Sequence, residues 1–406
     1  MESPHGEPSP PQIRRIEDRI NRLRARKVPI YGGPEDLDLP LDDGIAVIRG
    51  PRWSNIALMV NGGRASSANI RRYEVGFAGC RLLAGGVAGV STAMEHRFKS
   101  YARSVMVNSL RWMRKAGCDV SLLFGISGFY PKFGYAEVLP QVTFTLNARQ
   151  AAGLDGEGFR FVAFRREHLP ALLAMYRDDN RERTGPIRRD IRTWRPFRKG
   201  VRWGLKTACR VALDADEKPA GYFVYDRRAE GARIVEAGFA GPRVFPAIVA
   251  ATGRLARRRG GDEVVFNLPE DSRLMAWCKR LGIEKRVRHR RDGGGMARMI
   301  NIPSALGKLA PLLAGRVGGR GRLTIRTNLD NATIAWSPGR ASVLPASAAG
   351  PQAAMPQWAL AQLLYGYADA PELADRGILT GSAEAVRIVS GMFPAGPHFF
   401  YGVDEF

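Results

Sequence analysis

The sequence has few cysteines, no long apolar run and a shortage of acidic residues, and each absence narrows the function. Its four cysteines, Cys80, Cys118, Cys209 and Cys278, lie far apart without a Cys-x-x-Cys pair, so the pattern predicts neither a disulfide framework nor a metal site. No stretch approaches the ~20 apolar residues of a membrane-spanning helix. The start, Met1–Gln12, is polar and proline-rich, unlike a secretion signal. We therefore expect a cytoplasmic protein with no transmembrane segment and no metal.

The shortage of acidic residues leaves a large positive charge. The chain has 62 lysines and arginines against 39 aspartates and glutamates, which gives a formal net charge of +23. Such an excess can indicate nucleic acid, an anionic membrane surface or an acidic ligand as the partner. A coding bias towards arginine and a ligand that carries phosphates are each sufficient explanations. The charge alone therefore does not select a function.

The length of the chain and the order of its elements predict several domains. At 406 residues the chain exceeds the roughly 250–300 residues of the largest single cores. Residues 1–44 are predicted to form a polar tail with a charged helix around Ile13–Lys27. Residues 45–150 and 151–302 show the same order of strands and helices, and residues 303–406 combine helices with a hairpin. We expect an α/β (α+β) fold with two mixed-sheet domains and a third, smaller domain.

One segment of the first domain has the pattern of an anion-binding site. It comprises a strand over Gly86–Ala93, a loop, a helix over Ser100–Ala116 and a buried strand over Val120–Ile126. The first turn of a helix has free backbone N–H groups and the positive end of the helix dipole. Arg97 and Lys99 add positive charge beside that turn. The pattern therefore predicts a site for phosphate groups.

Two motifs in this segment resemble those of the GNAT superfamily of acyl-CoA-dependent N-acyltransferases. Arg97-Phe-Lys-Ser-Tyr-Ala102 resembles the Arg/Gln-x-x-Gly-x-Gly/Ala loop that binds the CoA pyrophosphate, with Ser100 in place of the usual glycine. Phe129-Tyr-Pro-Lys-Phe-Gly-Tyr135 resembles the family's Phe-Tyr-x-x-Phe-Gly-Phe/Tyr signature. The two motifs stand in the family's order. A side chain at Ser100 crowds the loop where glycine allows a close phosphate approach.

The resemblance implies acetyl-CoA, or another short acyl-CoA, as the co-substrate. The pantetheine arm would pair with the strand before the loop, and the loop and the helix start would hold the pyrophosphate. The cofactor-binding residues implied in this way are Val90, Ser91, Thr92, Arg97, Phe98, Lys99, Ser100, Tyr101, Ala102 and Arg103. Tyr130 would return a proton to the CoA thiolate, since a phenol has a pKa of about 10. The alternative for Tyr130 is an aromatic core residue.

The region 45–406 resembles the Eis (enhanced intracellular survival) type of GNAT enzyme. The second domain resembles a degenerate GNAT half, because Gly241-Pro-Arg-Val244 stands where the phosphate-loop motif would be. The last domain resembles a sterol-carrier-protein-2-like domain, in Gly321–Thr327 and in Pro356–Leu364. Enzymes of this type are oligomeric, so the resemblance also implies a homo-oligomer.

The end of the chain resembles the Eis type as well. There the chain ends at an aromatic residue whose terminal carboxylate serves as the base for the attacking amine. This chain ends in Phe399-Phe-Tyr-Gly-Val-Asp-Glu-Phe406, so the resemblance implies Phe406 as a catalytic residue, with Asp404 and Glu405 as rival bases. A frayed terminus is the alternative. Residues 1–44 depart from the family, so the resemblance does not imply a particular acceptor.

These observations together predict an N-acetyltransferase that transfers an acyl group directly to a small-molecule or peptide amine. One alternative is a catalytically inactive lipid-carrier or scaffold protein, which Ser100 in the phosphate loop favours. Nucleic acid is a further alternative, through the arginine-rich runs Arg188–Lys206, Arg254–Arg259 and Lys285–Arg291. It is the least favoured, because no helix-turn-helix, zinc or RNA-binding signature accompanies these runs.

Overall fold

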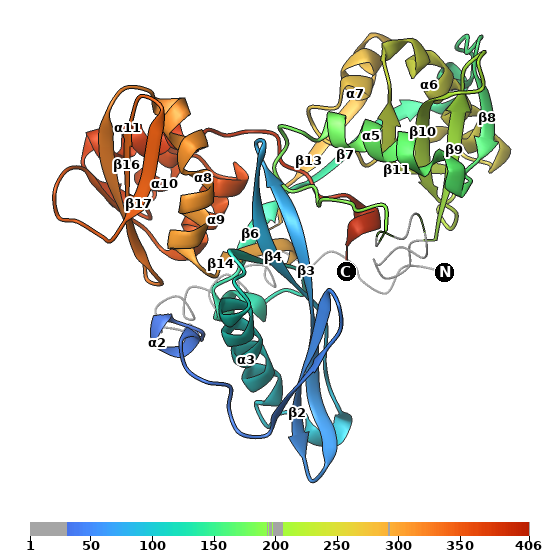
Figure 1. The fold of residues 1–406 in the computed structure, drawn as a ribbon. Coiled ribbons are helices and arrows are strands. Elements are labelled where there is room, and N and C mark those ends of the chain that lie inside the picture. The colour runs from blue at the N-terminus through green and yellow to red at the C-terminus, as the bar shows by residue number, and fades with distance from the viewer. Residues whose placement is uncertain (1–30, 193, 195–196, 198–205, 291–292, 406) are drawn as a thin grey trace, which may run out of the picture.

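The computed structural model describes residues 31–192, 194, 197, 206–290 and 293–405, and they form three β-sheets with covering helices (Figure 1). The helix expected around Ile13–Lys27 lies outside the described residues. Within the part of the chain that is described, no helix is long and apolar enough to span a lipid bilayer. The mixed α/β fold class expected from the sequence is confirmed.

The first sheet has seven strands in the order β1-β2-β3-β4-β5-β14-β6. Their bounds are β1 (Ile45–Arg49), β2 (Trp53–Val60), β3 (Gly63–Phe77), β4 (Cys80–Thr92), β5 (Val120–Gly125), β6 (Ala136–Leu139) and β14 (Gly294–Met299). Helix α3 (Tyr101–Lys115) packs on β2, β3 and β4, and the short α2 (Pro34–Leu37) packs on α3. The strand expected over Gly86–Ala93 begins earlier, at Cys80, because β4 pairs along its length with β3.

Helix α3 covers the first sheet because its apolar residues recur at helical spacing. Met106, Leu110 and Met113 are each fully buried, on one side of the helix. They meet Ile56 and Ile70 from the sheet in one apolar core. Burying each such side chain stabilises the fold by about 1.5–3 kcal/mol. This packing fixes the direction of the helix start relative to the end of β4.

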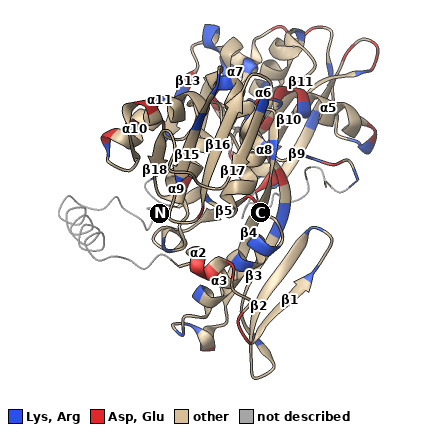
Figure 2. Ribbon diagram, turned by 60° about the vertical axis from the view of Figure 1, so that its left-hand side comes forward, with Lys and Arg blue, Asp and Glu red and all other residues tan. Residues whose placement is uncertain are grey.

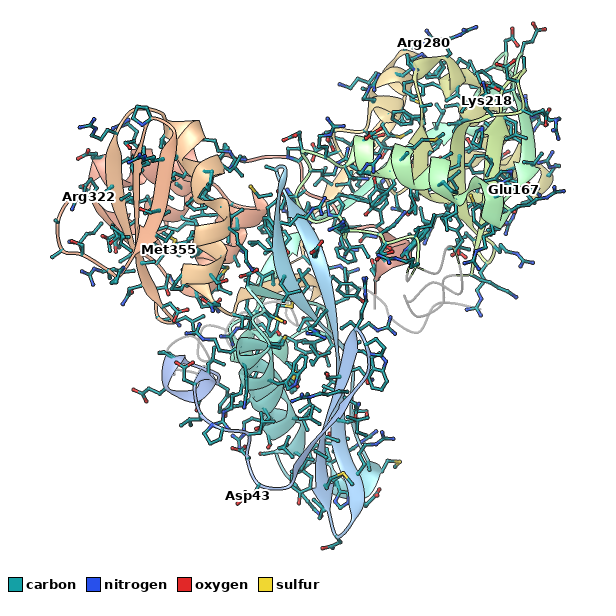
Figure 3. All side chains as sticks on the ribbon, viewed as in Figure 1. Asp43, Glu167, Lys218, Arg280, Arg322 and Met355 are labelled. Carbon is teal, nitrogen blue, oxygen red and sulfur yellow. The ribbon has the colours of Figure 1, made fainter. Side chains whose placement is uncertain are left out.

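The second sheet has the order β13-β7-β12-β11-β10-β9-β8. Its strands are β7 (Gln141–Asn147), β8 (Arg160–Ala163), β9 (Thr207–Leu213), β10 (Pro219–Asp226), β11 (Ala232–Phe239), β12 (Glu263–Phe266) and β13 (Glu284–Arg288). Its helices are α4 (Ala148–Ala152), α5 (Leu169–Asp179), α6 (Phe245–Arg258) and α7 (Arg273–Cys278). Figure 3 shows the labelled side chains of Glu167, Lys218 and Arg280 pointing outward from this lobe.

Two strands cross between the first two sheets. Strand β7 lies before residue 150 yet pairs with β12 and β13 of the second sheet. Strand β14 lies before residue 302 yet is inserted between β5 and β6 of the first sheet. The boundary expected at residue 150 therefore does not separate the sheets. Strand exchange depends on long-range pairing, which the local sequence pattern does not encode.

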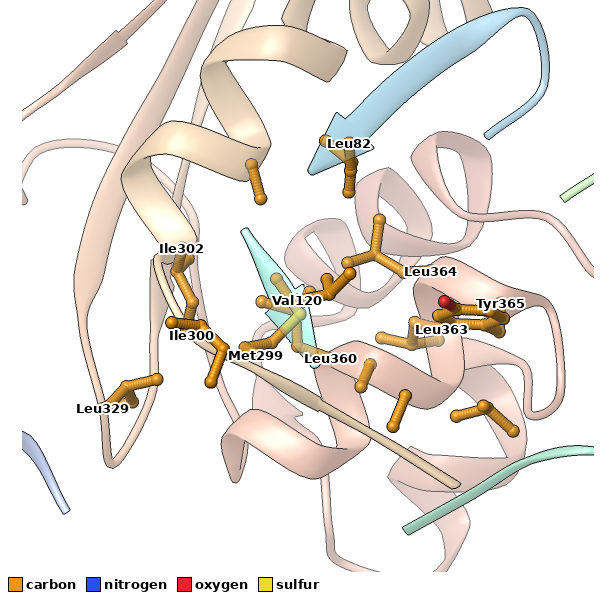
Figure 4. Close-up of a cluster of buried hydrophobic side chains, with 14 of the residues drawn as sticks. Leu82, Val120, Met299, Ile300, Ile302, Leu329, Leu360, Leu363, Leu364 and Tyr365 are labelled. Atoms are coloured by element: carbon orange, nitrogen blue, oxygen red, sulfur yellow. The ribbon is translucent and has the colours of Figure 1, made fainter. Parts of the chain in front are cut away.

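The third sheet has the order β17-β16-β15-β18-β19 and belongs to the C-terminal lobe. Its strands are β15 (Gly321–Arg326), β16 (Asn331–Ser337), β17 (Arg340–Leu344), β18 (Gln352–Ala354) and β19 (Thr380–Gly381). Its helices are α8 (Ile302–Val317), α9 (Gln357–Tyr365), α10 (Ala370–Asp375) and α11 (Ala383–Met392). Figure 4 shows one apolar cluster that joins Leu82, Val120 and Met299 of the first sheet to Leu360 and Leu363 of α9.

Gln357 links this lobe to the inserted strand through two buried hydrogen bonds. Its Oε1 accepts from the Met299 amide at 2.7 Å, and its Nε2 donates to the Gly134 carbonyl at 2.6 Å. The side chain is 2% exposed. Both backbone groups lie where water does not reach them, so they depend on this amide for hydrogen bonds.

We predict that Gln357→Leu destabilises the protein by about 2–5 kcal/mol, because it leaves two buried backbone groups unpaired at about 1–3 kcal/mol each. Chemical unfolding followed by tryptophan fluorescence measures the loss. The exposed Gln150→Leu is the matched control and is expected to stay within about 0.5 kcal/mol of the parent. Equal effects of the two substitutions would contradict the proposed link.

Candidate functional site

Strands β4 and β5 pair over a short distance and then separate. Their parallel pairing runs from Ala84 opposite Val120 to Val87 opposite Leu123, while β4 continues to Thr92. Just beyond the last pair, Gly89 has a φ of 56° and the β3–β4 register shifts. A bulge of this kind bends its strand, and β4 bends there while it stays paired with β3 as far as Thr92. Val90, Ser91 and Thr92, the residues implied for the pantetheine arm, lie along the opening.

The loop after β4 carries the residues implied for the pyrophosphate. It begins with a 3-10 turn, η1 (Met94–His96), and Arg97, Phe98, Lys99 and Ser100 are all exposed. Ser100 is the residue that caps the start of α3, with a φ of 62° and a ψ of 14°. This left-handed conformation favours glycine and costs roughly 1–2 kcal/mol with a side chain. This backbone conformation explains why glycine is usual in the motif at the position that Ser100 occupies here.

The start of α3 can bind an anion through its backbone. The amides of Arg103 and Ser104 both donate to the Ser100 carbonyl, at 3.0 and 3.1 Å, so the helical hydrogen bonds begin there. In the described structure the preceding amides of Tyr101 and Ala102 have no backbone acceptor. These amides and the positive end of the helix dipole fit a phosphate group.

Two other side chains at the loop have distinct environments. His96 packs against Tyr101, and its Nδ1 is buried without a hydrogen-bond partner among the described residues. Such an atom is the kind of group that a bound ligand satisfies. The Arg103 guanidinium instead donates to the Tyr31 hydroxyl at 2.9 Å and lies over the Tyr31 ring. Arg103 is thus already engaged by the hydroxyl and the ring of Tyr31.

Tyr130 lies at the far side of the opening, in the 3-10 turn η2 (Tyr130–Phe133) that follows β5. Its ring covers Gly125, where an added Cβ would come within 2.4 Å of a Tyr130 ring carbon. Burial raises the pKa of the Tyr130 phenol above its ordinary value, so the hydroxyl stays protonated at neutral pH. Tyr135 is different: its hydroxyl contacts the Ser121 hydroxyl at 2.6 Å in the core, which is a structural role.

A buried arginine holds η2 in position. Arg298 of β14 donates to the Phe133 carbonyl at 2.6 Å and to the Gly32 carbonyl at 3.0 Å. Burial lowers the pKa of Arg298 to about 10, which still leaves the guanidinium charged at neutral pH. The inserted strand therefore orients the turn that carries Tyr130.

The C-terminal tail is docked between the first and second sheets. Phe400, Tyr401, Asp404 and Glu405 are all buried. The Phe400 ring lies 5.3 Å from that of Phe124 at the end of β5. The tail ends in a 3-10 turn, η6 (Gly402–Asp404), against β11. Phe406 itself lies outside the described residues.

Arg189 anchors this tail, a role that was not predicted from the sequence. Its guanidinium donates to Glu236 on β11 at 2.7 Å and to Asp404 at 2.8 Å. It lies between the rings of Tyr176 and Trp194, at 3.6 and 4.3 Å from their centroids. Asp404, a rival base in the sequence reading, is committed to this ion pair. No sequence signal distinguishes Arg189 from its neighbours in the run Arg188–Lys206.

Comparison with protein families identifies the class of the first domain. Residues 51–138 match the family model described as an acetyltransferase (GNAT) domain. This segment contains the β4–β5 opening, the loop before α3 and Tyr130. The protein is therefore an acetyltransferase, with a domain type that implies acetyl-CoA as co-substrate and an amine as acceptor.

Solved structures with the same fold extend over most of the chain. A probable N-acyltransferase of unknown function from Enterococcus faecalis has a TM-score of 0.71 at 17% identity, covering 86% of this chain and 89% of its own. A GCN5-related N-acetyltransferase from Anabaena variabilis has a TM-score of 0.68 at 18% identity, covering 87% and 90%. Eis1 from Mycobacterium abscessus has a TM-score of 0.62 at 18% identity, covering 96% and 98%. No curated relative matches the sequence significantly.

We predict that Ser100→Gly tightens CoA binding by about fivefold, the factor that corresponds to roughly 1 kcal/mol, because the hydroxymethyl group no longer limits phosphate approach. Calorimetric titration with CoA measures the change. Glu217→Gly is the matched control, since Glu217 also has a left-handed φ, of 60°, but lies between β9 and β10. An unchanged affinity in Ser100→Gly would show that this side chain does not limit the site.

We predict that Arg189→Met destabilises the docked tail by about 3–5 kcal/mol, because Asp404 and Glu236 are left as unpaired buried carboxylates. Limited proteolysis of the C-terminal tail, followed by mass spectrometry, measures its release. The neighbouring Arg188→Met is the control, because Arg188 is exposed and pairs with Glu74 at the surface. Equal protection of the tail in both variants would rule out the anchoring role.

Proposed function

We propose that the protein transfers an acetyl or other short acyl group from acyl-CoA directly to an amine. The observation that carries the proposal is the separation of β4 and β5, which lies between an anion-binding helix start and a half-buried phenol. A ligand with phosphates at one end and a thioester at the other matches both ends of this opening. The matched GNAT domain spans the same residues.

In this proposal the backbone does most of the binding. Val90, Ser91 and Thr92 pair with the pantetheine arm, and the amides at Ser100 to Ala102 bind the pyrophosphate. The exposed side chains of Arg97 and Lys99 add charge, and Phe98 and Arg103 flank the loop. Backbone contacts of this kind explain why the loop tolerates unusual side chains.

The proposed reaction needs two proton transfers. The amine gives a proton to a base, its nitrogen attacks the thioester carbonyl, the C–N bond forms and the C–S bond breaks. The leaving thiolate then takes a proton from the Tyr130 hydroxyl. Tyr130 suits this role because its phenol is protonated at neutral pH, and burial raises its pKa further.

Direct transfer is supported by the state of the thiols. Burial raises the pKa of Cys118 and of Cys278 to about 12 each, and it also raises the pKa of Cys80 and Cys209. The thiolate is the nucleophilic form of cysteine, so these groups are poorly suited to carry an acyl group. A covalent enzyme intermediate is therefore not part of the proposal.

For the base we propose the terminal carboxylate of Phe406. The docking of residues 399–405, with the Phe400 ring beside Phe124 at the end of β5, supports this assignment. The engagement of Asp404 with Arg189 removes one rival, and Glu405 remains the other. We propose further that residues 303–406 form a sterol-carrier-protein-2-like domain and that the enzyme is a cytoplasmic homo-oligomer.

We predict that Tyr130→Phe and a chain lacking Phe406 each lose about 10²–10⁴-fold in kcat, the usual contribution of a general acid or base, while CoA affinity stays the same. Thiol release from acetyl-CoA with a panel of polyamines, aminoglycosides and lysine peptides measures the loss. Tyr367→Phe is the control, because Tyr367 lies beside His289 and His398, away from the opening.

The dependence of activity on pH tests the role of Tyr130 as the acid. The acid acts in its protonated form, and burial, which raises the pKa of Tyr130, extends that form further into the alkaline range. Activity is therefore expected to persist into the alkaline range, with a falling limb that Tyr130→Phe abolishes. A protein that neither binds CoA nor releases thiol would contradict the proposal and favour the inactive carrier or scaffold.

A further inference from the structure

A second feature of the first sheet, a cavity of about 340 Å³, lies on the face that α3 does not cover. Residues of β2 and β3 alternate between the two faces, so Ile56 and Ile70 meet α3 while Asn55 and Asn69 point the other way. The side chains that matter for its chemistry are those of Trp53, Asn55, Arg64, Asn69 and Ser91.

The cavity adjoins the proposed acyl-transfer site. Gly89 and Ser91 line it, and they are the bulge residue and a residue of the segment assigned to the pantetheine arm. Ser91 lies opposite Ser67 of β3, so both face the cavity. An acceptor held here would therefore lie beside the reacting thioester.

One end of the cavity offers a hydrogen-bond acceptor for an amine. Asn55 and Asn69 are cross-strand partners, and Asn55 Nδ2 donates to Asn69 Oδ1 at 2.9 Å. Asn55 Oδ1 is buried and has no partner among the described residues. A neutral amide oxygen in this position can accept an N–H bond without raising the pKa of the amine through a full negative charge.

The other end is basic, and the sheet around it has almost no acidic groups. Arg64 lines the cavity and forms no ion pair with any described residue. Residues 45–93 contain six arginines and one carboxylate, Glu74. Glu74 is already paired with Arg188 at 3.0 Å, and the nearby Asp190 with Arg52 at 3.3 Å. In Figure 2 basic positions lie along this sheet, whereas α2, on the helix side, is acidic.

We propose that the acceptor is an amine that also carries an anionic group, a carboxylate or a phosphate-like group, with Arg64 as the residue that binds the anion. This inference rests on the proposed function. The amine lies at Asn55 beside the β4 bulge, and the anion lies at Arg64. The cavity has room for roughly ten water-sized groups, and Asn55 and Met59, the partner of Arg64, are about 13 Å apart along β2. Polycationic acceptors are disfavoured by Arg64.

The test compares acceptors whose amines have similar basicity but whose far ends differ. β-Alanine, 4-aminobutyrate and 5-aminovalerate are each compared with the diamine and the alkylamine of equal chain length. For the amino carboxylates, kcat/KM is expected to be at least about tenfold higher than for the diamines, as a charge-assisted hydrogen bond provides. 3-Aminopropylphosphonate against 4-aminobutyrate shows which anion is preferred.

Substitutions at Arg64 test whether the preference for amino carboxylates arises in the cavity. The ratio to compare is kcat/KM for an amino carboxylate divided by kcat/KM for the diamine of equal chain length. Arg64→Gln is expected to reduce this ratio about tenfold through KM, and Arg64→Glu is expected to make the diamine the better acceptor. Arg81→Gln is the matched control, because Arg81 is an exposed β4 arginine that pairs with Glu74 and does not line the cavity. A preference for diamines, or the same ratio in Arg64→Gln as in the parent, would overturn the inference.

A binding measurement keeps this inference separate from the proposed function. Calorimetry of 4-aminobutyrate with the full chain does not require turnover. Binding that depends on Arg64 without acylation of any amine would leave the anion site standing and would refute the acyltransferase mechanism. Acylation of other amines without binding of the amino carboxylates would leave the acyltransferase mechanism standing and would refute the anion site.

Discussion

The separation of β4 from β5 at the Gly89 bulge is the constraint on which the rest of the site depends. A continuous β-sheet leaves no room for a ligand between neighbouring strands, because their backbone groups bond each other. Here the β4–β5 pairing stops at Val87 and Leu123, while β4 continues beside β3 to Thr92. The freed edge faces the start of α3 on one side and Tyr130 on the other. In the proposed mechanism, phosphate binding, thiolate protonation and access for an amine all depend on this one opening.

The opening is held from several distant parts of the chain. Strand β14 supplies Arg298, which fixes the turn that carries Tyr130, and α9 holds β14 through Gln357. Arg189 fixes the C-terminal tail to the second sheet. The second and third lobes therefore contribute to the site by positioning elements of the first lobe.

The sequence predicted the local elements of the site well, because they depend on local patterns. The helix over Ser100–Ala116 and the strand over Val120–Ile126 agree with α3 and β5 to within a residue at each end. The strand exchange and the roles of Arg298 and Arg189 were not predicted. These features depend on contacts between residues more than a hundred positions apart. In addition, the sequence around an arginine in a basic run does not show whether its side chain is buried. The assignments of Tyr130 and Phe406 remain predictions.

Hydrogen–deuterium exchange of the intact protein with and without CoA shows whether CoA binds in the opening between β4 and β5. We expect CoA to protect the amides of residues 88–103, at the end of β4 and the start of α3. We expect no protection of residues 236–247, the corresponding strand end and helix start of the second sheet. Protection at 236–247, or none at 88–103 at a saturating CoA concentration, would contradict a CoA site in this opening.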